Sequence, residues 1–106
     1  MTVHITMRYF DGCPSWQTAL ANLEVAALRI RADIDVTVQN VETFEDAERL
    51  GFTGSPTLLL NGVDPFAVPG TAPALACRVY DTPAGFAGSP TVDQLAAVLA
   101  ASGASP

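Results

Sequence analysis

The sequence predicts a single α/β domain in which a mixed sheet of about four strands is flanked by three helices. Alternating apolar residues from Val3 to Phe10 are typical of a strand that ends in a turn. Apolar residues at helical spacing follow from Trp16 to Ile30, and a second alternating run covers Ile34 to Val38. Strand, helix and strand in this order imply a right-handed parallel pair.

The middle of the chain predicts a short helix and a buried central strand. Thr43, followed three residues later by Asp46, is typical of a capping box that opens a helix ending near Leu50. Gly51 can then adopt the left-handed conformation that often ends a helix. The apolar run Thr57 to Leu60 lies between turn residues, which favours a buried strand.

The last third of the chain is harder to interpret because prolines interrupt its pattern. Residues 63–74 predict a long surface loop, and a further strand is expected over Ala76 to Tyr80. Residues 85–88 are expected to be a loop, and Ser89-Pro90-Thr91 should open the last helix. We expect residues 1–101 to form the domain and residues 102–106 to form a frayed tail.

Composition limits the classes of partner. The chain has 106 residues with 11 acidic and 5 basic side chains and a net charge of −6, which disfavours nucleic acid and anionic membrane surfaces. No run approaches the ~20 apolar residues of a membrane span. The first residues lead directly into the strand pattern without a signal peptide, so we expect a cytoplasmic protein.

Cys13 is the main candidate for chemistry. It lies where the first strand ends and the first helix begins, so we expect it at the N-cap with Pro14 at the first helical position. The unpaired amide groups there should lower the pKa of the Cys13 thiol below about 8.5, although Asp11 opposes this effect. The alternative is an unreactive capping cysteine, since free cysteine is often a small buried hydrophobe.

The order of these elements resembles the thioredoxin-like superfamily over nearly the whole chain. Cys13-Pro14-Ser15-Trp16 occupies the place of that family's C-x-x-C motif, and Ser55-Pro56-Thr57 is similar to its cis-proline segment. The resemblance implies that Cys13 is the catalytic nucleophile and that Pro14, Trp16, Ser55 and Pro56 contact the substrate. Trp16 replaces the second cysteine and cannot resolve a mixed disulfide. The interpretation we favour from the residue alone is that it packs against the loops, the alternative being that its indole gates access to the thiol or stacks on a bound group. Pro56 could equally be an ordinary trans proline that starts a strand.

Cys77 is the other cysteine and could be the missing partner. If Ala76–Tyr80 pairs antiparallel with Thr57–Leu60, Cys77 lies roughly 10 Å from Pro56 at ~3.3 Å per residue. A disulfide needs Cα atoms within about 7 Å. We therefore expect Cys77 to be structural and out of reach of Cys13, with Arg78 alternating outward.

Three functions are compatible with these residues. The first is a thioredoxin-like monothiol protein in which Cys13 exchanges with a thiol-bearing or disulfide-bearing small molecule or protein. The second, from a weaker resemblance to alkylmercury lyase-like proteins, is a soft-metal or organomercurial handler that uses Cys13 and Cys77. The third is a non-catalytic interaction module, suggested by Trp16. No cofactor is expected, and two cysteines with His4 do not make a structural zinc site.

Overall fold

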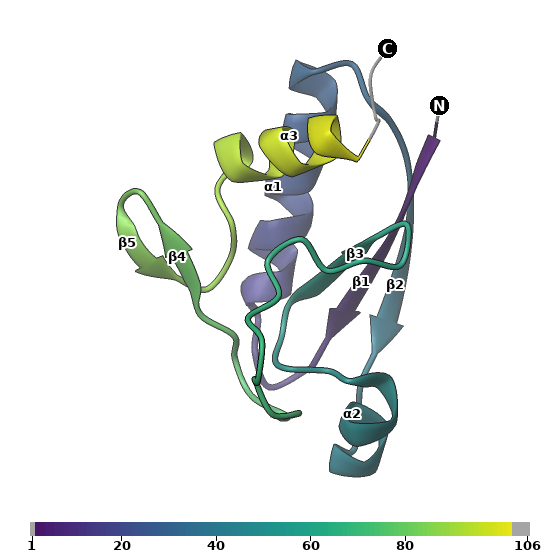
Figure 1. Ribbon diagram of the computed structural model, residues 1–106, viewed down its shortest axis with the longest axis vertical. Helices are drawn as coiled ribbons and strands as arrows, with labels where there is room; N and C mark the ends of the chain where they lie inside the picture. The colour runs from purple at the N-terminus through teal and green to yellow at the C-terminus, as the bar shows by residue number, and fades with distance from the viewer. Residues whose placement is uncertain (1, 103–106) are drawn as a thin grey trace.

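The computed structural model describes residues 2–102, and over these residues the chain is an α/β protein, as predicted. Its helices and strands are arranged as Figure 1 shows. In chain order they are β1 (Thr2–Tyr9), α1 (Ser15–Arg29), β2 (Asp33–Asn40), α2 (Phe44–Leu50), β3 (Thr57–Leu60), β4 (Tyr80–Thr82), β5 (Gly85–Ala87) and α3 (Val92–Ala101).

The main sheet has three strands in the order β2-β1-β3. β1 and β2 are parallel in register from Thr2 opposite Asp33 to Tyr9 opposite Asn40, so the predicted parallel pair is confirmed. β3 runs antiparallel to β1, with Ile5 opposite Leu60. The run expected to be a central strand is therefore buried but lies at an edge of the sheet, and β1 is the central strand.

The core lies between this sheet and two helices. Alternate residues of β1 point toward α1 and α3, which lie on the same side of the sheet (Figure 1). Because each of these helices carries apolar residues along one face, both faces are removed from water together. The buried members of this cluster are Val3, Ile5, Met7, Ala19, Leu23, Ala26, Ala27, Leu58, Leu60, Leu95 and Leu99.

Thr43 caps the start of α2, Gly51 ends α2 and Thr91 opens α3, as predicted, although only the Thr43 half of the expected capping box is formed at α2. The Thr43 side chain accepts a hydrogen bond from the Asp46 N–H at 3.0 Å, and Gly51 ends α2 in the left-handed region with φ 67°. Thr91 and Gln94 form a reciprocal capping box at the start of α3. Ser102 ends α3 by donating its N–H to Val98. The rest of the predicted frayed tail, residues 103–106, lies outside the described residues.

The last third of the chain differs from the prediction. β4 and β5 form a separate antiparallel hairpin with Thr82 opposite Gly85, so the expected four-stranded sheet is a three-stranded sheet and a two-stranded one. The predicted strand over Ala76–Tyr80 begins only at Tyr80, and the predicted loop 85–88 contains β5. The hairpin is short and all of β5 is exposed, so alternating burial left little pattern there.

No helix within residues 2–102 has the length and apolar character that crossing a bilayer would require.

Candidate functional site

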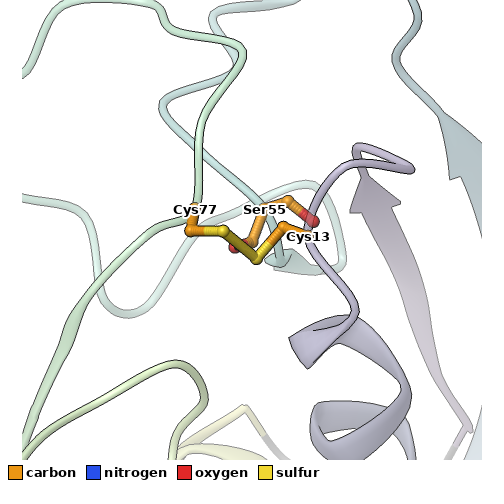
Figure 2. Close-up of a disulfide and its surroundings, with 3 residues drawn as sticks. All are labelled: Cys13, Ser55 and Cys77. Atoms are coloured by element: carbon orange, nitrogen blue, oxygen red, sulfur yellow. A yellow bond between two sulfur atoms is a disulfide. The ribbon is translucent and has the colours of Figure 1, made fainter.

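Cys13 and Cys77 are joined by a disulfide, although 64 positions separate them in the sequence (Figure 2). Their Cα atoms are 5.5 Å apart, which is within the usual range for a disulfide. The expectation that Cys77 lies out of reach of Cys13 is therefore wrong. So is the picture of Cys13 as a lone thiol, since no cysteine in the chain is free.

The path of the chain before Cys77 explains this error. We expected residues 76–80 to pair antiparallel with β3, but residues 76–78 form a parallel bridge to Ser55, which precedes β3. The Ser55 N–H donates to the Ala76 carbonyl at 2.8 Å, and the Arg78 N–H donates to the Ser55 carbonyl at 2.9 Å. Cys77 therefore lies opposite Ser55, at the start of β3 and beside Cys13.

The two cysteines differ in their access to solvent. Cys13 is only 1% exposed, whereas Cys77 is exposed. Cys13 is not the N-cap of α1 as predicted. The N-cap is Pro14, and Cys13 precedes it by one residue. Its N–H donates to the Phe10 carbonyl in the turn after β1, at 3.0 Å. The bond thus joins an inner sulfur that is shielded by the protein to an outer residue at the surface.

The segment Ser55-Pro56 lies against the inner sulfur. The Ser55 carbonyl oxygen is 3.7 Å from Cys13 Sγ, and the Ser55–Pro56 peptide bond is cis. Both residues are buried, and the Tyr80 hydroxyl donates to the Pro56 carbonyl. The Ser55 hydroxyl is buried and finds no hydrogen-bond partner within residues 2–102. A buried hydroxyl without a partner is uncommon, so this one is notable beside a disulfide.

The other two candidate residues have different surroundings. Pro14 is exposed at the N-cap of α1. Trp16 stacks on Tyr9 with ring centroids 4.4 Å apart and packs against the main core. The structure therefore brings together Cys13, Ser55 and Pro56, while the indole of Trp16 contributes to packing.

Arg78 anchors the segment that carries Cys77, and the sequence did not reveal this role. Its guanidinium forms an ion pair with Asp64 at 2.7 Å, donates to the Phe66 carbonyl at 2.6 Å and lies 4.6 Å from the centre of the Tyr80 ring. The Arg78 and Asp64 side chains are 9% and 16% exposed, so the expectation that Arg78 alternates outward is wrong. Only the presence of an acidic residue in the same loop hinted at a buried pair.

Gly54 and Tyr80 complete this anchor. A Cβ atom on Gly54 would lie 2.9 Å from the Arg78 Cβ, so the absence of a side chain permits the close approach of the two segments. Burial raises the pKa of the Tyr80 phenol well above its ordinary value, so the hydroxyl remains a donor at neutral pH. The Cys77 segment is thus held by polar contacts on both sides of the cysteine.

The remaining ionisable candidates lie apart from the disulfide. His4 is exposed and 3.3 Å from Asp35 across β1 and β2. A hydrogen bond from Arg49 lowers the pKa of Asp46, which belongs to the capped start of α2. Within residues 2–102, no three side chains of the His, Cys, Asp and Glu types lie close enough to share a metal ion.

Comparison with protein-family models, with curated proteins and with solved structures finds no match to this chain.

Proposed function

We propose that this chain is a thiol–disulfide exchange protein whose redox pair is Cys13 and Cys77. The observation that carries the proposal is a disulfide between one shielded and one exposed cysteine, packed against the Ser55–Pro56 peptide. A cysteine at the surface can be approached by an incoming thiolate, and a neighbouring shielded sulfur can leave or return without diffusing away.

The resemblance to the thioredoxin-like superfamily supports this function. In both, a cysteine precedes the helix that follows the first strand, and a cis-proline segment lies next to it, here Ser55-Pro56-Thr57. This chain departs from the family pattern because its second cysteine comes from residue 77 and not from position 16. The second cysteine that position 16 lacks is thus provided by Cys77, which follows the loop 63–74.

The difference in exposure between the two residues supports the following roles. In the reduced protein, the Cys77 thiol loses its proton to water, and the thiolate attacks a substrate disulfide. One substrate sulfur leaves as a thiolate and takes up a proton, and a mixed disulfide with Cys77 remains. Cys13 then loses its proton and attacks Cys77 Sγ, which releases the second substrate thiol and forms the Cys13–Cys77 bond.

In this sequence of steps two electrons pass from the protein to the substrate disulfide. An external thiol reductant returns the oxidised protein to the dithiol form in two steps. Its thiolate attacks Cys77 Sγ and displaces Cys13, which takes up a proton. A second reductant thiolate then attacks the mixed disulfide and releases Cys77, which also takes up a proton, and the two reductant sulfurs leave as a disulfide. The same steps run in reverse when the substrate is a dithiol. Cys77 is therefore the nucleophile and Cys13 the resolving cysteine, which reverses the role that the thioredoxin-like resemblance implied for Cys13.

Single cysteine variants test this assignment. After reduction and removal of the reductant, each variant is mixed with oxidised glutathione, and the mixed disulfide is measured by mass spectrometry. Cys13→Ser should accumulate a stable adduct on Cys77, because nothing resolves it. Cys77→Ser should form its adduct at least about tenfold more slowly, because the Cys13 sulfur is shielded.

Equal rates in the two variants would contradict these roles. The wild-type protein supplies the control against a purely structural bond. If its disulfide stays closed in a glutathione buffer and its reduction potential lies below about −300 mV, the bond is structural and the proposed function fails.

A second candidate function is the binding of a soft metal ion by the reduced pair, since the fold brings two thiols together. The reduced protein would bind one mercuric ion through Cys13 and Cys77. Titration of the reduced wild type with mercuric ion, beside Cys13→Ser and Cys77→Ser, tests it. One-to-one binding that survives in either single variant would exclude a two-thiol site.

A further inference from the structure

The segment Cys77–Val79 has one occupied backbone edge and one open edge. On one side, Ala76 and Arg78 hydrogen-bond to Ser55. In a nearly extended chain the groups of the intervening residues point the other way. The backbone N–H and C=O groups of Cys77 and Val79 make no hydrogen bond to any part of the chain that the structure describes.

Residues of this segment line two adjoining hollows. The first, of about 230 Å³, is lined by Cys77 together with Thr53, Thr71, Val68, Arg78 and Val79. The second, of about 320 Å³, shares the last three of these residues and continues to Phe66 and Phe86. The two hollows therefore form one groove that begins at the disulfide and follows the chain toward β4.

The groove carries exposed apolar side chains. Val68 and Val79 are exposed, and Phe86 is 80% exposed on β5. An unpaired backbone edge beside exposed apolar side chains is suited to an added strand, in which main-chain hydrogen bonds give affinity and side-chain pockets give specificity. Because Cys77 lies at one end of the groove, an added strand that contains a cysteine would place its sulfur where it can exchange with the disulfide.

We propose that this groove binds an extended, apolar, cysteine-bearing segment of a partner protein, which pairs with the backbone of Cys77 and Val79. The proposal rests on the proposed function, because it names the substrate of the same disulfide. A small thiol would fill only the first hollow and would leave the backbone edge and Phe86 unused. Because the chain carries 11 acidic and 5 basic residues, the segment is neutral or basic.

The bound segment reacts by the exchange already described. Its cysteine thiolate attacks Cys77 Sγ, the Cys77–Cys13 bond breaks, and Cys13 leaves as a thiolate that takes up a proton. The segment is then held by a disulfide to Cys77 and by the strand contacts. A second thiol of the partner releases it as a disulfide and leaves the protein reduced.

Binding without chemistry is tested first. The probe is an eight-residue peptide of alternating Val and Thr with serine at its fourth position, where the reactive form of the peptide carries cysteine. Titration into the oxidised protein should shift the backbone amide NMR signals of Cys77 and Val79. The double variant Val79→Ser/Phe86→Ser should raise the dissociation constant of the peptide about tenfold, because two apolar contacts are lost.

Leu28→Ser is the matched control, because Leu28 is also 80% exposed but lies on α1. It should bind the peptide as the wild type does. If the peptide leaves the Cys77 and Val79 signals unchanged at millimolar concentration, or if both variants weaken binding equally, the proposal is overturned. This readout does not depend on whether the disulfide exchanges.

The reaction is tested second, with the same peptide carrying its cysteine. It should form a mixed disulfide with the oxidised protein about tenfold faster than free cysteine does, and Val79→Ser/Phe86→Ser should remove that advantage. If the peptide binds but no thiol opens the disulfide, the proposed exchange function fails and the groove remains a peptide-binding site. Equal rates for the peptide and free cysteine would overturn the groove as the substrate site.

Discussion

Residues 2–60 and residues 61–90 are held in place by different means. In the first region, β1, α1, β2 and β3 bury regularly spaced apolar side chains in one core. In the second, the chain has one short hairpin and depends on the disulfide, the Arg78–Asp64 pair and the Tyr80 hydrogen bond. The candidate site lies where these two regions meet.

This difference bears on how the candidate site is assembled. The first region positions Cys13 and Ser55 rigidly, because both are buried at the ends of packed elements. The second region carries Cys77 on a segment that reaches the buried clusters through Phe66 and Leu75. Its position also depends on a few polar bonds that can be removed one at a time. Substitutions in the second region should therefore change the site and leave the main core intact.

Opening the disulfide should have the largest effect on stability. The bond closes a loop across 64 positions, and the chain-entropy estimate for a loop of this length is about 4 kcal/mol. We expect reduction to lower the free energy of unfolding by about this amount, because the unfolded chain gains the freedom that the bond removes. Urea denaturation with and without a reductant measures it.

Cys77→Ala is the matched variant, since it removes the bond at an exposed residue and leaves Cys13 in place. It should be as unstable as the reduced wild type. A loss below about 1 kcal/mol in both would show that contacts other than the disulfide restrain the loop, and the contrast between the two regions would then be smaller than we describe.

Removing the Arg78 guanidinium should have the next largest effect. Arg78→Met leaves the Asp64 carboxylate largely buried without its partner, and such losses cost about 3 kcal/mol. The variant should also raise the reduction potential of the disulfide, because the Cys77 segment is no longer held beside Ser55. Thermal unfolding and equilibration with a glutathione buffer measure the two effects.

Arg49→Met is the control for charge removal, because its pair with Asp46 is exposed. It should leave both the unfolding free energy and the reduction potential nearly unchanged, because solvent screens an exposed pair. If Arg78→Met behaves like Arg49→Met, the buried pair does not position Cys77.

The contrast also explains what could be predicted from the sequence. β1, α1, β2 and β3 follow from repeated apolar spacing, which reflects the main core, and α2 follows from its capping residues. β4 and β5 left no such pattern, because each spans three residues and Phe86 faces solvent. Apolar periodicity and capping residues therefore predicted the elements that they themselves stabilise, and not the short hairpin.

Only part of the candidate site could be predicted, because only part of it lies next to elements with a clear sequence pattern. Cys13 and Ser55-Pro56 were recognisable because each lies next to a predictable element. The position of Cys77 depends on how residues 61–75 return toward Ser55, and this path is fixed by long-range contacts such as that of Arg78 with Asp64. Pairing direction in such a segment has no signature in the sequence, and the assumption of an antiparallel pair placed Cys77 too far away.

The smallest expected effect concerns the Tyr80 hydroxyl, which joins the second region to the Ser55–Pro56 peptide. Tyr80→Phe removes the donor to the Pro56 carbonyl and should lower the free energy of unfolding at pH 7 by about 1 kcal/mol, because a buried acceptor loses its partner.

The Tyr80→Phe variant should also differ from the wild type in its stability at alkaline pH. Burial raises the pKa of Tyr80 in the folded state above its value of 10.0 in the unfolded chain, so the stability that this group contributes is complete below pH 10.0 and falls as the pH rises beyond it. Wild type should therefore lose stability above pH 10.0 more steeply than Tyr80→Phe does, as measured by urea denaturation at several alkaline pH values. Parallel curves for the two proteins would mean that the phenol is not shielded from water, and the contact between the two regions would then be looser than the structure indicates.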